Sequence, residues 1–153
     1  MLQIISSSEQ RTDQLGFKLG TLLQRGDIVC LTGDLGAGKT TLSKAIARGL
    51  DIEEDVTSPT FTIIHEYMGR LPLYHFDVYR IEDPIQMEDL GYEEYFYGDG
   101  VCIVEWASKI QGLIPTEHLW VHIVKGIEEE QRIIEIKGIG RHYQEIIEEL
   151  RSL

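Results

Sequence analysis

Short apolar runs alternate with amphipathic stretches along the whole chain. The segments 27–33 ("DIVCLTG") and 101–106 ("VCIVEW") are apolar and β-branched, which is typical of strands buried on both faces of a sheet. Segment 60–80 has aromatic and β-branched arms around Gly69 and Pro72, and this predicts two strands joined by a turn. The segments 118–126 and 132–138 predict a further strand pair.

The first amphipathic stretch predicts a helix after residue 5. Ser6 and Glu9 stand at the spacing of a capping box, in which each side chain bonds the backbone of the other residue. Four leucines then recur at helical spacing and would form one apolar face: Leu15, Leu19, Leu22 and Leu23.

Three more helices are expected. The segment 40–50 predicts a helix that ends near Gly49 and turns Leu42, Ala45 and Ile46 inward. The segment 83–96 predicts a short helix that is capped by Asp83, begins at Pro84 and is interrupted by Gly91. The chain closes with a helix over 141–153.

The order of these elements favours an α/β fold. We expect a three-layer sandwich with a mostly parallel central sheet and antiparallel hairpin additions. The 153 residues, 42% of them hydrophobic, suffice for one core, and no repeat or linker-like stretch divides them. Residues 1–153 are therefore expected to form a single domain.

The excess of acidic residues limits which molecules the chain can bind. With 14 Lys and Arg against 26 Asp and Glu, the formal net charge is −12, so the chain should not bind nucleic acid unaided. Cys30 and Cys102 lie in apolar strands, where free buried thiols are favoured over a disulfide. No apolar run is long enough to span a membrane and the first ten residues lack a signal-peptide layout, so a cytoplasmic location is expected.

The sequence "GDLGAGKTT" predicts a phosphate-binding loop. Gly33, Gly38, Lys39 and Thr40 match G-x-x-x-x-G-K-[ST], a pattern in which small residues let backbone N–H groups converge on phosphate oxygens. Lys39 would contact the β- and γ-phosphates, the Thr40 hydroxyl would bind Mg²⁺, and Thr41 would bond a further phosphate oxygen. A strand before the loop and a helix after it support this interpretation over a chance glycine-rich turn, and they make the expected α/β sandwich one of the P-loop NTPase type.

Two carboxylates end neighbouring apolar runs and suit hydrolysis. Asp77 follows "LPLYHF" and Glu105 follows "VCIV", and strand ends of this kind lie beside the site that a glycine loop builds. One would bind Mg²⁺ and the other Mg²⁺ or the attacking water. Thr60 in "TSPTF" is a candidate sensor of the γ-phosphate. The alternative for each is an ordinary solvated residue at a strand end or turn.

The motif set resembles the bacterial TsaE family. The matching motifs are "GDLGAGKTT", "SPTF", "YHFDVYR", "DLGYEEYF" and "VEW", in this order, and the resemblance covers roughly residues 8 to 115. The sequence departs from the family pattern at Val78, where leucine is usual, and lacks the proline that often follows the tryptophan of "VEW". The C-terminal third carries no matching motif.

The resemblance implies an ATPase with Mg²⁺ that supports threonylcarbamoyladenosine formation in tRNA, next to the anticodon. Such a protein is not the transferase; it acts with TsaD and TsaB partner proteins to sustain turnover, and tRNA is held by the complex. The acidic charge of this chain agrees with indirect contact to tRNA.

Carried over by position, the resemblance also implies site residues. Thr40 and Glu105 would serve the metal, Asp77 would be the Walker-B-like acid, and Glu9 would approach the nucleotide. Trp106 would report nucleotide binding or touch a partner, unless it is a packed core indole. The ATP-binding loop would comprise Leu35, Gly36, Ala37, Gly38, Lys39 and Thr40.

Several alternatives stay open. Arg80 is a candidate cation for transition-state charge or a plain surface ion-pair residue. A small-molecule kinase would need a basic lid, and 81–100 contains no Lys or Arg; a non-hydrolysing nucleotide-gated adaptor would not need Asp77 and Glu105. The five histidines lack metal-ligand spacing, so no zinc site is predicted.

Overall fold

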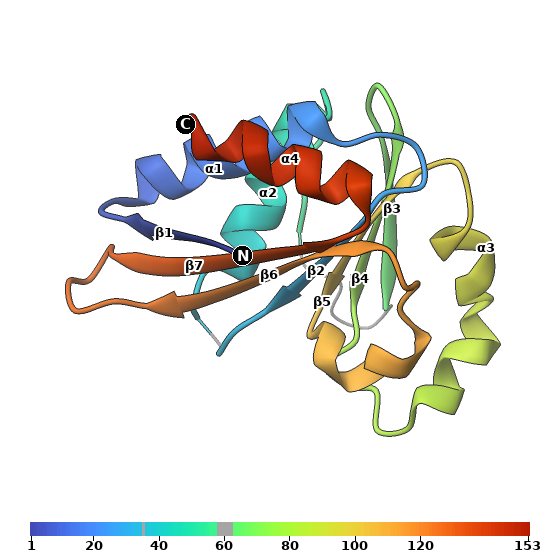
Figure 1. Cartoon of the computed structure of the whole chain (residues 1–153). Helices are drawn as coiled ribbons and strands as arrows, with labels where there is room; N and C mark the ends of the chain where they lie inside the picture. Colours follow the sequence, from blue (N-terminus) through green and yellow to red (C-terminus); the bar gives the residue numbers. More distant parts are fainter. Residues whose placement is uncertain (35, 58–62) are drawn as a thin grey trace.

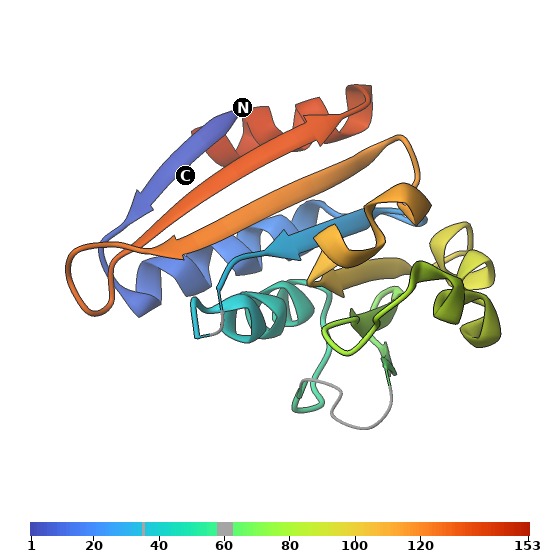
Figure 2. The same cartoon turned by 90° about the horizontal axis from the view of Figure 1, so that it is seen from below.

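The fold is built around one seven-stranded sheet with helices on both faces (Figures 1 and 2). The computed structural model describes residues 1–34, 36–57 and 63–153. The strand order across the sheet is β1-β7-β6-β2-β5-β4-β3. The strands are β1 (Leu2–Ser6), β2 (Ile28–Thr32), β3 (Ile64–Met68), β4 (Pro72–Asp77), β5 (Val101–Glu105), β6 (His118–Lys125) and β7 (Arg132–Ile139).

The middle of the sheet is parallel and its flanks are antiparallel. β6, β2, β5 and β4 pair in parallel, whereas β7 and β1 on one side and β3 on the other are added in antiparallel orientation. Every residue of β2 and β5 is buried, as expected for strands covered on both faces. The predicted α/β class, with a mostly parallel core and antiparallel hairpin additions, is confirmed.

The helices form the two outer layers. α1 (Glu9–Leu22), α2 (Lys39–Gly49) and α4 (Arg141–Arg151) lie on one face and share its apolar core with the strands. Two 3-10 helices and one short α-helix pack on the other face over a second core: η1 (Pro84–Leu90), α3 (Tyr92–Phe96) and η2 (Ala107–Leu113). The predicted positions of Asp83 as a cap and Gly91 as the interruption between η1 and α3 are confirmed.

α1 and α2 pack closely because glycines line their contact. A Cβ added at Gly20 would lie 2.2 Å from the carbonyl oxygen of Ile46, and one added at Gly49 would lie 2.3 Å from that of Phe17. Both distances are shorter than any tolerated contact, so only glycine permits this approach of the two backbones. The helix that follows the phosphate loop is therefore held directly against α1.

The predicted start of the first helix is wrong. Ser6 is not a cap but the last residue of β1, where it is buried and its hydroxyl lies 2.7 Å from that of Thr12. The cap is Ser8, whose side chain accepts a hydrogen bond from the backbone N–H of Arg11, so that Glu9 is the first helical residue. The error arose because three serines in a row offer three candidate caps, and the strand before them pairs with distant β7.

The two cysteines are free and buried, as expected. Burial raises the pKa of both thiols, so both stay protonated and behave as small apolar side chains. Among the described residues, no helix is both long enough and apolar enough to cross a membrane.

Candidate functional site

The phosphate loop connects the end of β2 with the start of α2. Gly33 has φ +145° and Gly38 has φ +112°, conformations that side chains with a Cβ rarely adopt. At Gly33 a Cβ would also lie 2.2 Å from the carbonyl oxygen of Ile123. The loop therefore depends on glycine at these positions, and the free N–H groups of the α2 N-terminus give it the polarity of an anion site.

Lys39 is folded back onto the loop. Its ammonium donates hydrogen bonds to the carbonyl oxygens of Gly33 (2.6 Å) and Asp34 (2.8 Å), and it lies 4.3 Å from the ring centroid of Trp106. Only 5% of the residue is exposed. Burial lowers the pKa of the ammonium, and the carboxylates of Glu105, Asp34 and Asp77 partly oppose that effect. A phosphate would offer this buried cation a counter-charge.

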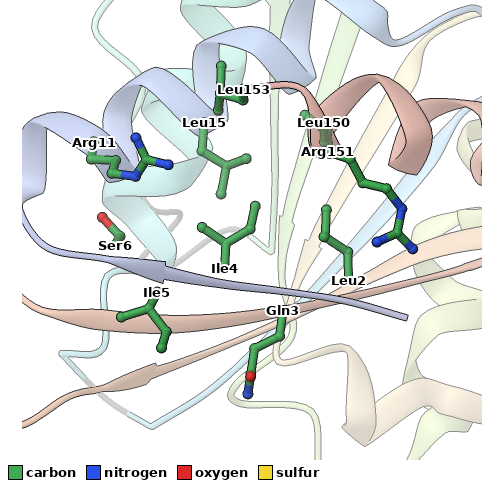
Figure 3. Close-up of a pocket in the computed structure, with 10 residues that line it drawn as sticks. All are labelled: Leu2, Gln3, Ile4, Ile5, Ser6, Arg11, Leu15, Leu150, Arg151 and Leu153. Carbon is green, nitrogen blue, oxygen red and sulfur yellow. The ribbon is translucent and has the colours of Figure 1, made fainter.

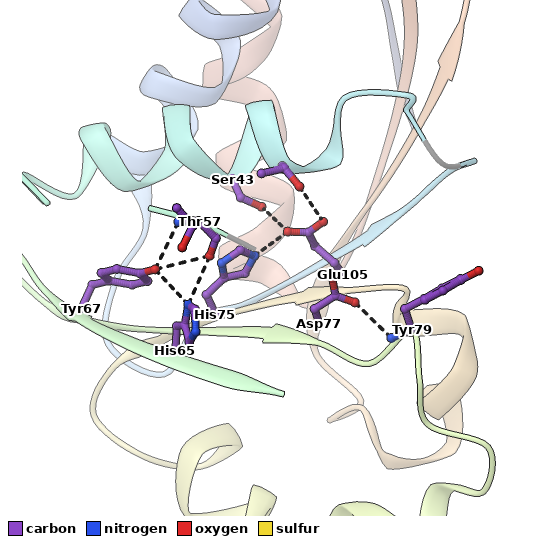
Figure 4. Close-up of polar contacts among 9 residues, drawn as sticks. Ser43, Thr57, His65, Tyr67, His75, Asp77, Tyr79 and Glu105 are labelled. Carbon is purple, nitrogen blue, oxygen red and sulfur yellow. Dashed lines mark hydrogen bonds and ion pairs between the residues drawn. The ribbon is translucent and has the colours of Figure 1, made fainter. Parts of the chain in front are cut away.

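Glu105 is a buried acid of the site, and both of its carboxylate oxygens have hydrogen-bond partners. Parallel pairing of β4 and β5 places it directly opposite Asp77. Its Oε1 accepts from the Thr40 hydroxyl (3.4 Å), and its Oε2 accepts from the Ser43 hydroxyl (3.3 Å) and lies 2.5 Å from His75 Nε2 (Figure 4). Glu105 is 2% exposed, so these three groups provide its polar surroundings in place of water.

Asp77 is half-buried at the end of β4. Its Oδ1 accepts from the backbone N–H of Tyr79 (3.0 Å; Figure 4). Burial raises the pKa of this carboxyl and the charge of Glu105 adds to the rise, while the Tyr79 hydrogen bond and the positive charge of Lys39 oppose it. A carboxyl with a raised pKa is a stronger base than a solvated one.

Aromatic side chains border the two acids. Trp106 follows Glu105 and adopts a left-handed conformation with φ +63°, which is uncommon for a bulky residue and is characteristic of functional sites. Its ring lies 4.8 Å from that of Tyr79, and the Lys109 ammonium lies 5.2 Å from the Tyr79 ring. The indole of Trp106 lies against the Lys39 ammonium, and the partly buried residue also packs on the second core.

A pocket of about 170 Å³ adjoins the outer side of the loop. The Arg132 guanidinium donates to the carbonyl oxygen of Ala37 (2.7 Å), and the Glu9 backbone N–H donates to Glu130 (3.1 Å). The pocket is thus closed by the start of α1 on one side and by the β6–β7 hairpin on the other. Its lining residues are Glu9, Thr12, Gly36, Ala37, Gly38, Thr41, Ile123, Glu130 and Arg132.

A larger pocket of about 250 Å³ lies elsewhere, between the edge strand β1 and the ends of α1 and α4 (Figure 3). Leu2, Ile4 and Leu15 contribute apolar surface there, and Arg11 and Arg151 lie at its rim. It contains none of the residues predicted for the site. Size alone therefore does not identify the functional pocket of this molecule.

Most residues predicted for the site converge at one edge of the sheet. The loop, Thr41, Asp77, Glu105 and Trp106 surround the N-terminus of α2, and Glu9 reaches the adjoining pocket. Leu35 and Thr60 lie outside the described residues. Thr57, the last described residue before the "SPTF" motif, donates its backbone N–H to the Tyr67 hydroxyl of β3 (3.2 Å; Figure 4).

The sequence reasoning missed four polar residues of the site: Ser43, His75, Glu130 and Arg132. One signal was present for His75, because residues two apart on a strand share a face and Asp77 was already a candidate. Ser43 lies one helical turn after Lys39 and could have been found from that spacing. Nothing local marked Glu130 or Arg132, since the hairpin that carries them approaches the loop only through the fold.

The chain is similar to known proteins over most of its length. The sequence model described as "Threonylcarbamoyl adenosine biosynthesis protein TsaE" matches residues 6–134. A protein of Bacillus subtilis named tRNA threonylcarbamoyladenosine biosynthesis protein TsaE is 52% identical over 126 residues, which are 82% of this chain and 78% of that protein. The protein of the same name from Treponema pallidum is 45% identical over 114 residues, 74% of this chain and 84% of that protein.

A solved structure agrees as well. The crystal structure of Bacillus subtilis YdiB superimposes with a TM-score of 0.82 and 39% sequence identity, covering 99% of this chain and 94% of that one. The similarity therefore extends beyond the motifs to the C-terminal hairpin and α4, which carry no recognisable motif of their own.

Proposed function

Because this chain belongs to the TsaE family of threonylcarbamoyl adenosine biosynthesis proteins, we propose that it binds and hydrolyses ATP in support of that tRNA modification. The observation that carries the proposal is the convergence of the Lys39 loop with two in-register strand-end acids, Asp77 and Glu105. Two acids beside the loop, one for Mg²⁺ and one for the attacking water, favour hydrolysis over nucleotide binding alone.

Nucleotide binding is supported by three cations that lie at the glycine loop of an otherwise acidic chain. The chain carries a net charge of −12, yet Lys39 and Arg132 both bond loop carbonyls. Lys125 also approaches, since its ammonium would lie 3.7 Å from a Cβ added at Gly36. Three cations and a helix N-terminus around one glycine loop suit a polyphosphate. The pocket beside Glu9 and Arg132 is the proposed place for the rest of the nucleotide.

The oxygen donors of the site fit magnesium. Thr40 Oγ1 and Glu105 Oε1 lie 3.4 Å apart, and the Asp77 carboxyl is in register with Glu105 on the neighbouring strand. Mg²⁺ prefers hard oxygen ligands, so Thr40 and Glu105 would hold it together with the phosphates, with Asp77 beside them on the neighbouring strand. When bound, the ion supplies neutralisation of the phosphate charge.

The two acids are proposed to have different tasks. Glu105 is buried and fully hydrogen-bonded, which suits a fixed orientation towards Thr40. Asp77 is more accessible, and its raised pKa suits a group that orients the attacking water and accepts its proton. Lys39 would leave its loop carbonyls and bond the β- and γ-phosphates. Arg80, exposed three residues beyond Asp77, remains a candidate for a cation that a partner places.

Partner proteins complete the proposal. An acidic chain does not gather tRNA phosphates, so tRNA would be held by proteins of the TsaD and TsaB types and contacted only through the complex. We propose that hydrolysis is slow in the isolated chain and rises when those partners are present.

The test is ATP consumption by the purified chain in three settings: alone, with small-molecule phosphate acceptors, and with TsaD- and TsaB-type proteins plus tRNA. Phosphate release that depends on the partners is expected. Transfer of phosphate to a small acceptor would instead support a kinase, and nucleotide binding without release in any setting would support an adaptor.

Variants sharpen this experiment. Glu105→Ala should abolish phosphate release, because Thr40 would lose the acid beside it. Lys44→Met is the matched control, since Lys44 is a half-exposed lysine of the same helix whose ammonium lies 4.0 Å from Asp55. Normal hydrolysis by Glu105→Ala would remove Glu105 from the chemistry.

A further inference from the structure

We propose that His75 is a positioning residue for the reaction: it fixes the Glu105 carboxylate so that one oxygen is tied inside the protein and the other faces Thr40. The inference rests on the proposed function, in which Glu105 serves Mg²⁺ and ATP. It adds a residue that touches neither of them and that acts only through Glu105.

The two side chains meet across neighbouring strands. His75 lies in β4 opposite Ile103 of β5, and Glu105 follows two residues later on the same face. The imidazole is fully buried, and its Nε2 lies 2.5 Å from Glu105 Oε2. Figure 4 shows the ring pointing from β4 towards the carboxylate, below the start of α2. Because neither residue is solvated, this contact is not one of the weak ion pairs of a protein surface.

The two oxygens of the Glu105 carboxylate have different partners. Oε2 accepts from His75 and from the Ser43 hydroxyl at 3.3 Å, so its hydrogen-bonding capacity is used within the protein. Oε1 faces the Thr40 hydroxyl, 3.4 Å away, at the first turn of the nucleotide-binding helix. His75 and Ser43 thus anchor Oε2, and Oε1 is left as the oxygen that serves the site.

The surroundings of the two ring nitrogens indicate which of them carries a hydrogen. Among the described residues, His75 Nδ1 is buried without a hydrogen-bond partner. A buried N–H without an acceptor is costly, whereas Nε2–H has a carboxylate oxygen to bond. The geometry therefore places a proton on Nε2, which the imidazole donates to Glu105.

A purely structural role would not require this chemistry. His75 is fully buried between Ile103 and His65 of the neighbouring strands, and an apolar side chain at this position would leave no nitrogen unpartnered. The presence of a histidine at this position is explained by the hydrogen bond that its Nε2–H donates to Glu105 Oε2. That donor limits the rotation of Glu105, and with it the direction of Oε1.

Two amide substitutions separate the effect of the hydrogen-bond donor at His75 from the effect of side-chain size. In His75→Gln the amide nitrogen stands near the position of Nε2 and can still bond Oε2; in His75→Asn the amide is too short to reach. We would measure the affinity for a non-hydrolysable ATP analogue by calorimetry, with EDTA and across a Mg²⁺ titration, and record melting temperatures.

The expected result is a selective loss of the magnesium response. His75→Asn should match the wild type within twofold in EDTA, but should need about tenfold more Mg²⁺ for half-maximal effect, the loss typical of one hydrogen bond to a charged group. His75→Gln should stay within about threefold of the wild type. An unchanged Mg²⁺ requirement in His75→Asn, or an equal loss in both variants, would overturn the proposal.

A measurement on the unsubstituted chain covers the case in which a variant does not fold. A long-range ¹H–¹⁵N spectrum should show His75 as the Nε2–H tautomer, and Glu105→Ala should shift that signal. An Nδ1–H tautomer would refute the assignment. The proposed function fails separately, because it fails if Mg²⁺ has no effect on nucleotide affinity in the wild type, whatever the spectrum shows.

Discussion

Lys39 offers the sharpest test of nucleotide binding, through the substitution Lys39→Met. Methionine keeps the length of the buried stem and removes the ammonium together with its two bonds to Gly33 and Asp34. Burial already lowers the pKa of that ammonium, so the charge is poorly solvated in the free chain and has little net value for folding. Its value should appear when phosphate is bound.

The size of the effect follows from the contacts that would be lost. A hydrogen bond from a charged group is worth about 1.5 to 3 kcal/mol, and this corresponds to a loss of about 10- to 150-fold in nucleotide affinity. The melting temperature should move by no more than about 4 °C, the shift that about 1 kcal/mol produces in a domain of this size.

Calorimetric titration with ADP and with a non-hydrolysable ATP analogue measures the affinity, and thermal unfolding without nucleotide measures the stability. The exposed-lysine variant Lys44→Met should bind like the wild type. An affinity of Lys39→Met within threefold of the wild type, at unchanged stability, would refute the role of Lys39 as the phosphate-binding cation. An equal loss in Lys44→Met would show that charge on α2 in general, and not the buried ammonium, governs binding.

Two further predictions concern Asp77 and the α1–α2 contact. The folded chain holds the Asp77 proton more tightly than the unfolded chain does, so the stability from this group is present below its ordinary pKa of 3.8 and is lost as pH rises through the raised folded value. Asp77→Asn should therefore raise the melting temperature at pH 7, lose that advantage below pH 3.8 and abolish hydrolysis; a lower melting temperature at pH 7 would contradict this reasoning. Gly20→Ala should destabilise the chain by about 1 to 3 kcal/mol in urea unfolding, because its Cβ would meet the Ile46 carbonyl at 2.2 Å, whereas the exposed substitution Gln14→Ala should change little.

The sequence allowed the central sheet and the phosphate loop to be predicted because their signals are local. Apolar β-branched runs mark buried strands whatever their neighbours are, and the glycines of the loop are required by the backbone angles of the loop itself. The first helix was placed correctly but its start was not. β1 spans only Leu2–Ser6, and what identifies it as a strand is its pairing with β7, more than a hundred residues away.

The site was predictable where one element carries its residues and not where the fold brings elements together. Asp77 and Glu105 ended recognisable strands, and the parallel register then placed them side by side. His75 looked like one more aromatic-strand residue, because its partner is 30 positions away and adjacent only through that register. Arg132 belongs to a hairpin whose sequence is unremarkable, and its contact with Ala37 depends on the position of β7 beyond β6.

The glycine contact between α1 and α2 has a mechanical consequence. α2 carries Thr40 and Ser43 on the turns that face Glu105, and backbone packing at Gly20 and Gly49 leaves this helix no room to slide or rotate against its neighbour. When one nucleotide replaces another, any adjustment of the site then has to occur on the side of the phosphates away from α2. The helix is thus a fixed element of the site, and its packing against α1 sets where Thr40 and Ser43 stand relative to Glu105.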